Sequence, residues 1–79
     1  MKRVHPVRVK WVDSTANGGW HSAATVATAV EPTSIASVGY LLEKNHKRVI
    51  IGQSMSVGTQ EICNLLTIPR FAVQSIKRL

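Results

Sequence analysis

Two apolar runs separated by a short polar segment constrain the fold of this chain more than any other feature. The first run occupies residues 35–42 and the second occupies residues 49–51, whereas residues 43–47 read Glu-Lys-Asn-His-Lys. β-Branched and aromatic residues on both sides of a polar tip predict a β-hairpin from Ser34 to Ser54. A hairpin alone is marginally stable in water, so we expect the flanking segments to cover its apolar face.

The chain of 79 residues predicts a single domain spanning residues 1–79. At this length folding buries only about 60–65 % of the surface of the unfolded chain, so the core must be small. The hydrophobic share of 44 % and the charged share of 18 % are those of a globular protein, and the aromatic share of only 5 % predicts an aliphatic core.

Residues 7–13 alternate apolar and basic side chains, which is the period of a half-buried strand. The alternation places three side chains on the inner face: Val7, Val9 and Trp11. Arg8 and Lys10 then face water, and Trp11 is predicted to be a core residue.

A short helix is predicted over residues 20–30, between the first and second strands. Ser22 is a suitable cap for its start, the body is rich in alanine, and Pro32 prevents its continuation. Its β-branched residues lower helix propensity, so we expect only a few turns.

The C-terminal third predicts two more strands. Residues 61–68 are so apolar that we expect part of this fourth strand to be covered on both faces, with Cys63 as an inert buried thiol. Pro69 ends that strand, residues 70–72 form one tight turn, and residues 73–79 form a fifth strand. Gly39 and Gly52 lie within strands, where glycine marks bends that let a sheet curl.

These elements predict a mainly β fold. Five short, curved strands are too few for a sandwich, and closure into a small antiparallel barrel hides every edge. We therefore expect a five-stranded barrel with one short helix between strands one and two.

The pattern resembles the Src-homology-3-like and Sm-like small barrels, which have five bent strands and a one-turn 3₁₀ helix before the last. The resemblance rests on residues 39–42, 49–51 and 68–76. It implies the barrel and no ligand residues, because the paired RNA-contact motifs of Sm-like proteins are not recognisable and the expected helix occupies a different place.

A second likeness spans most of the chain. Five short segments look like those of small uncharacterised proteins encoded by bacteriophages and prophages: residues 11–14, 19–20, 37–39, 53–54 and 68–70. This likeness implies a phage or prophage origin and carries no activity with it.

The net charge of +6 indicates anionic partners such as nucleic acid or acidic surfaces. In small barrels the terminal strands lie side by side, so seven cations are candidate ligands of phosphate: Lys2, Arg3, Arg8, Lys10, Arg70, Lys77 and Arg78. The competing interpretation is that these residues are solvated outward positions of two amphipathic strands.

No enzyme, cofactor or metal motif is recognisable. His5, His21 and His46 lie in separate segments without neighbouring ligands, which favours surface histidines over a metal site. The single cysteine excludes an internal disulfide and predicts a reducing, cytoplasmic environment. The sequence shows no signal-peptide pattern and no apolar run long enough for a bilayer, so no membrane partner is expected.

Two functions remain open from the sequence. The first is a non-enzymatic accessory protein that binds nucleic acid or phosphate-rich ligands through the terminal strands. The alternative is a protein-interaction module, such as an adaptor or inhibitor of a host factor, that docks through loops near Trp20 and Met55 or through a strand edge. Self-association is a further expectation, since apolar residues such as Val57, Leu65 and Phe71 suit a core or an interface.

Overall fold

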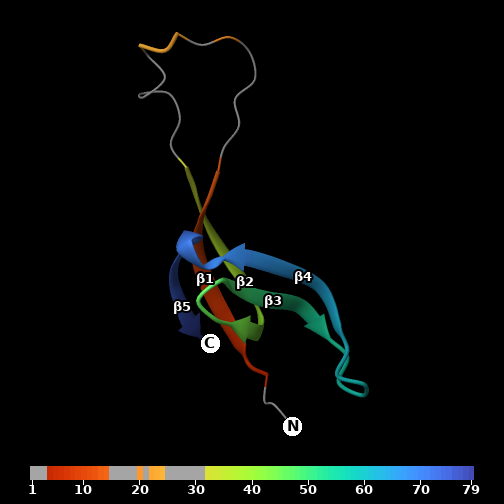
Figure 1. Ribbon diagram of the computed structural model, residues 1–79. Coiled ribbons are helices and arrows are strands. Elements are labelled where there is room, and N and C mark those ends of the chain that lie inside the picture. Colours follow the sequence, from red (N-terminus) through yellow and green to blue (C-terminus); the bar gives the residue numbers. More distant parts are fainter. Residues whose placement is uncertain (1–3, 15–19, 21, 25–31) are drawn as a thin grey trace.

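The computed structural model describes residues 4–14, 20, 22–24 and 32–79. Five strands follow one another in the chain: β1 (Pro6–Asp13), β2 (Thr33–Lys44), β3 (Arg48–Met55), β4 (Ile62–Pro69) and β5 (Val73–Arg78). A single 3₁₀ turn, η1 (Arg70–Ala72), precedes β5. All five strands form one antiparallel sheet in the order β4-β3-β2-β1-β5 (Figure 1). The predictions of a mainly β fold, five strands and a tight turn before the last are confirmed.

The central hairpin is formed by β2 and β3, as the sequence predicts. Asn45 shapes its tip, because its side-chain oxygen accepts hydrogen bonds from the backbone N–H groups of Lys47 at 2.8 Å and Arg48 at 3.0 Å. A side-chain amide that accepts bonds two and three residues ahead fixes a compact turn. The tip is therefore held in a compact turn although it is exposed.

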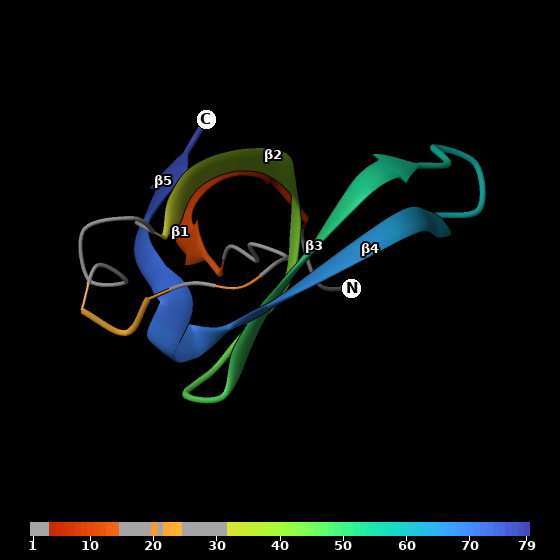
Figure 2. The ribbon, with the colours of Figure 1, turned by 90° about the horizontal axis from the view of Figure 1, so that it is seen from above.

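β2 is long enough to pair with two neighbouring strands, β1 and β3. Its first part, Thr33 to Tyr40, pairs with β1, and its last part, Tyr40 to Lys44, pairs with β3. Figure 2 shows the resulting arc of β2 over β1. Gly39 lies where the two halves meet, and a Cβ atom there would lie 2.7 Å from the backbone oxygen of Gly52. Glycine permits this close approach, whereas the register shift of β2 against β3 lies further on, between Leu41 and Glu43.

The core is aliphatic and small. Five apolar side chains among the described residues are buried: Val7, Val9, Val49, Ile51 and Ile68. Trp11 packs against this cluster, and its indole Nε1 donates a hydrogen bond to the Ser37 hydroxyl at 3.0 Å. The inner face predicted for β1 and the core position predicted for Trp11 are both confirmed.

The sheet is not closed. β1 pairs with β5, so the first and last strands do lie side by side, as predicted. β4 and β5, however, are the two edges of the sheet, joined through η1 without pairing to each other within the described residues. The predicted closed barrel is therefore replaced by a strongly curved open sheet.

The distal half of the β3–β4 hairpin projects away from the other strands (Figure 2). We call residues 53–66 the arm. Most of its side chains are exposed, including Cys63 and Leu65. The predictions of a doubly covered fourth strand and of a buried thiol are wrong, because only Ile68, at the base of β4, reaches the core.

The predicted helix over residues 20–30 falls largely outside the described residues. Those that are described there, Trp20 and residues 22–24, contain a turn at residues 23–24. Elsewhere in the described part of the chain the only helical element is η1. No helix in these described ranges has the length and apolar character needed to cross a bilayer.

Candidate nucleic-acid interface

The terminal strands bring three of the predicted cations onto one face. In the β1–β5 register Arg8 lies directly opposite Lys77, and Lys10 lies opposite Ser75. Residues opposite each other in antiparallel strands share a face, as do residues two apart along one strand. Arg8, Lys10 and Lys77 therefore lie together on the outer face of β1 and β5, which we call the basic ribbon.

No acidic side chain balances the basic ribbon within the described residues. The ion pair that these residues contain joins Arg48 to Glu43 at 3.2 Å, in the hairpin tip. Like charges placed directly opposite each other destabilise a sheet. Arg8 and Lys77 thus form a repulsive pair that a bound anion would relieve.

The other predicted cations are placed differently. Arg78 lies opposite Val7, a core residue, and thus on the other face of β5 from Lys77. Arg70 belongs to η1 and is half-buried, and its Nη1 atom is buried without a hydrogen-bond partner among the described residues. Lys2 and Arg3 lie outside the described residues.

A second cationic group was missed by the sequence analysis. The backbone N–H of Arg70 donates to the Lys47 oxygen at 2.9 Å, which fixes η1 against the tip of the β2–β3 hairpin. Lys44 and Lys47 are exposed on that tip, beside His46. The polar tip signals only a turn in the sequence, and its contact with residue 70 is a long-range feature that local pattern does not reveal.

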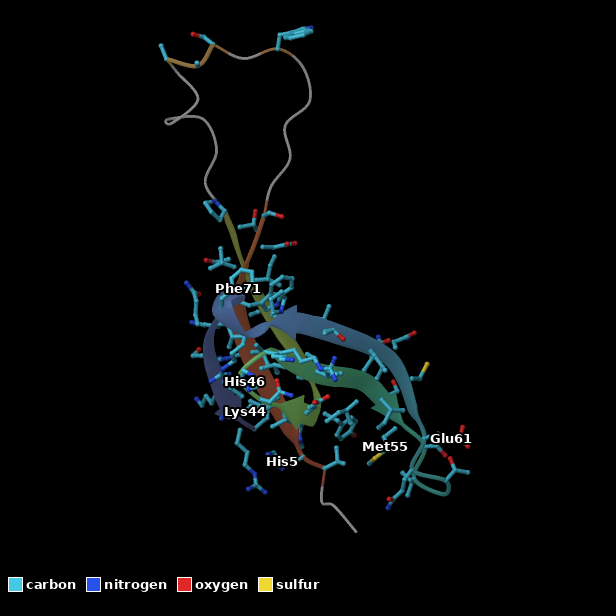
Figure 3. All side chains as sticks on the ribbon, in the orientation of Figure 1. His5, Lys44, His46, Met55, Glu61 and Phe71 are labelled. Carbon is cyan, nitrogen blue, oxygen red and sulfur yellow. The ribbon has the colours of Figure 1, made fainter. Side chains whose placement is uncertain are left out.

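Phe71 is the exposed ring nearest in sequence to these cations. Its side chain is 93 % exposed although η1 itself is tied to the hairpin tip. Figure 3 shows Phe71, His46 and Lys44 on the left side of the sheet, with Met55 and Glu61 at its lower right. An exposed aromatic side chain beside cations is the combination that stacks on unpaired bases.

The two predicted protein-contact residues differ in exposure. Trp20 is fully exposed, as an external contact requires. Met55 is half-buried at the end of β3, opposite Ile62. Docking through either residue stays a prediction.

The histidines do not form a metal site in the described part of the chain. His5 is half-buried before β1, His46 is exposed on the hairpin tip, and His21 lies outside the described residues. No group of three or more His, Cys, Asp or Glu side chains is suitably placed for a metal ion within these ranges.

A comparison with known protein families, curated proteins and solved structures finds no match for this chain.

Proposed function

We propose that this protein binds nucleic acid through the basic ribbon on the outer face of β1 and β5. The observation that carries the proposal is the register of Arg8 opposite Lys77, with Lys10 two residues further along β1 and no acidic partner among the described residues. Nucleic-acid binding depends chiefly on such contacts with phosphates.

The spacing of these cations also suits a phosphate chain. Residues two apart on a strand are separated by about 6.8 Å, which is twice the axial distance of about 3.4 Å between phosphates on one DNA strand. An open hollow of about 270 Å³ borders Lys10, lined by residues 34–36 of β2 and by Gln74 of β5. This hollow offers room beside the ribbon for a sugar or a base edge.

The sheet order and η1 support a relationship in architecture to the Src-homology-3-like and Sm-like barrels. Five bent antiparallel strands with a one-turn 3₁₀ element before the last are the features that the resemblance implies. The proposed fold is an open variant of this architecture, and the proposed phage or prophage origin gives the protein an accessory role rather than an enzymatic one.

The decisive experiment measures binding of a labelled DNA or RNA oligonucleotide at several salt concentrations. We expect the affinity to fall steeply with salt. Replacing Arg8, Lys10 and Lys77 together by glutamine should weaken binding by about 100-fold at about 0.1 M salt and make the salt dependence shallower by about 2–3 in the log–log slope. An oligonucleotide affinity that changes neither with salt concentration nor on the triple substitution would refute the proposal.

Arg78→Gln is the matched control. It removes one positive charge from the same strand, next to Lys77, but on the opposite face of the sheet. The affinity should stay within about twofold of the wild-type value, since exposed charges away from the ligand are screened. An equal loss from Arg78→Gln and Lys77→Gln would show that only net charge matters.

Protein docking is a second candidate function, favoured by the complete exposure of Trp20. Large aromatic side chains dominate the energetics of protein interfaces. A partner captured from a host lysate after nuclease treatment and lost on Trp20→Ala would support this function. Capture that is unchanged by the substitution would exclude Trp20 as the contact.

A further inference from the structure

We infer that this protein binds an unpaired nucleotide, with the base in a pocket between β2 and β3 and the phosphate on the adjacent Arg8. The inference rests on the proposed function, and it narrows the ligand from nucleic acid in general to single-stranded nucleic acid. A base enters a pocket of this kind only when it lies outside the stack of a duplex.

The pocket exists because β2 and β3 pair over only part of their length. Their pairing stops where Tyr40 lies opposite Gly52. From there β2 follows β1 back to Thr33, whereas β3 follows β4 as far as Met55. The two strands therefore diverge (Figure 2), and an open hollow of about 370 Å³ lies in the fork. We call it the fork pocket, and its wall includes Val38, Gln53, Asn64 and Leu65.

The fork pocket borders the basic ribbon. Val38 lies directly opposite Arg8 in the β1–β2 register, and Lys10 lies opposite Ala36. Residues directly opposite each other share a face of the sheet, with Cβ atoms about 4.5–5.5 Å apart. A cation for an anionic group and a pocket for a neutral group are thus neighbours. A nucleotide has the same division, since its sugar joins an anionic phosphate to an uncharged base.

The wall of the fork pocket is uncharged, because no Lys, Arg, Asp or Glu lines it. Val38 is 61 % exposed and Leu65 is 63 % exposed, so both side chains are accessible to a ligand. Apolar side chains pack against the faces of bases that have left a stack. The volume lies within the range of about 300–1,000 Å³ that small-molecule sites occupy. The fork pocket therefore suits the base, and Arg8 suits the phosphate.

Two amide side chains supply polar groups to the wall. The Asn64 amide nitrogen donates a hydrogen bond to the Gln53 side-chain oxygen at 2.5 Å. The bond leaves the Asn64 side-chain oxygen as an acceptor and the Gln53 nitrogen as a donor, and neither is bonded to protein within the described residues. Amide side chains of this kind pair with the donors and acceptors of base edges. A purely apolar partner would leave both groups without hydrogen bonds, at a cost in binding energy.

The backbone conformation of Asn64 also points to a ligand site. Its φ is 60°, a left-handed value that asparagine tolerates better than most residues but that is uncommon in a strand. Strained residues of this kind cluster at ligand sites. Gln60, with a φ of 61°, lies outside the strands, in the connection between β3 and β4, where turns commonly require such values.

Fluorescence anisotropy on the full chain tests the inference with two labelled ligands at about 0.1 M salt. One is a single-stranded DNA of about 12 nucleotides, and the other is the duplex of the same strand with its complement. We expect the single strand to bind at least about tenfold more tightly than the duplex. Equal or weaker binding of the single strand would overturn the inference and leave the proposed function intact. No binding of either ligand would overturn both.

Asn64→Gly removes the amide and keeps the backbone conformation, since glycine adopts a φ of 60° without strain. It should weaken binding of the single strand by about tenfold and change binding of the duplex by less than about twofold. Gln60→Gly is the matched control, because it makes the same change at a residue that does not line the fork pocket. Wild-type affinity for the single strand in Asn64→Gly, or an equal loss in Gln60→Gly, would overturn the inference.

Phe71→Ala distinguishes the fork pocket from the exposed ring on η1, where a base could also stack. We expect the Phe71→Ala chain to keep its preference for the single strand over the duplex. A preference that is lost in Phe71→Ala and kept in Asn64→Gly would place the unpaired base on η1 and overturn the inference.

Discussion

The two edge strands of the sheet present opposite kinds of surface. β5 ends in Lys77 and Arg78 and lies beside the cations of β1, whereas β4 carries no charge along Ile62–Pro69. Like charges on an edge discourage a second sheet from pairing there, and their absence permits it. The comparison teaches that the two open edges of one sheet can differ sharply in charge, with a cationic edge at β5 and an uncharged edge at β4.

The largest expected effect is a difference in stability loss between two positions of β4, one at its buried base and one in the exposed arm. Ile68 is completely buried, so Ile68→Ala should lower the free energy of unfolding by about 3 kcal/mol through lost burial and a cavity. Leu65→Ala, at 63 % exposure, should change it by at most about 0.5 kcal/mol in the monomer. Urea denaturation at low protein concentration measures both. Similar losses would mean that the arm belongs to the core and would break the comparison.

A second effect concerns the bend where β2 passes from β1 to β3. Gly39→Ala places a methyl group 2.7 Å from the Gly52 backbone oxygen and should cost about 2 kcal/mol of stability. Gly58→Ala, in the connection of the arm, meets nothing within 4 Å and should be nearly neutral. Thermal unfolding of the two variants compares a constrained part of the sheet with an open one. Equal melting temperatures would contradict the close approach at Gly39.

The smallest effect tests the repulsive pair of the basic ribbon. Lys77→Glu sets a carboxylate opposite Arg8 and should raise the free energy of unfolding by about 0.5 kcal/mol at low salt while weakening oligonucleotide binding. Ser54→Glu introduces a carboxylate on β3, opposite Cys63, in a stretch from residue 49 to residue 69 that has no lysine or arginine, and should give no such gain. A gain from both variants would indicate a general response to lower net charge.

Local patterns predicted most of the fold. The alternation of Val7, Val9 and Trp11 identified the inner face of β1, and the polar tip after Leu42 identified the central hairpin. Both signals are periodic and short in range, so they can be read from neighbouring residues. Proline at residue 69 likewise marked the end of β4 and the start of η1.

The failures involve contacts between distant segments. A continuous apolar run has the same pattern whether the strand is covered on both faces or exposed to solvent. The sequence therefore predicted a buried Cys63, although its side chain is exposed. The pairing of Arg8 with Lys77 followed from the expected side-by-side position of the terminal strands, but its exact register did not. The contact of Arg70 with Lys47 joins two loops, and neither loop carries a pattern that points to the other.

The pairing of β1 with β5 also sets the order of events during synthesis. Pro6 to Asp13 leave the ribosome before their second neighbour, Val73 to Arg78, has been made. At about 5–20 residues per second, synthesis of the intervening residues takes seconds, whereas a hairpin forms in about 1–10 µs. During synthesis β1 can therefore pair with β2 alone, and its other edge stays unpaired until Arg78 has been made.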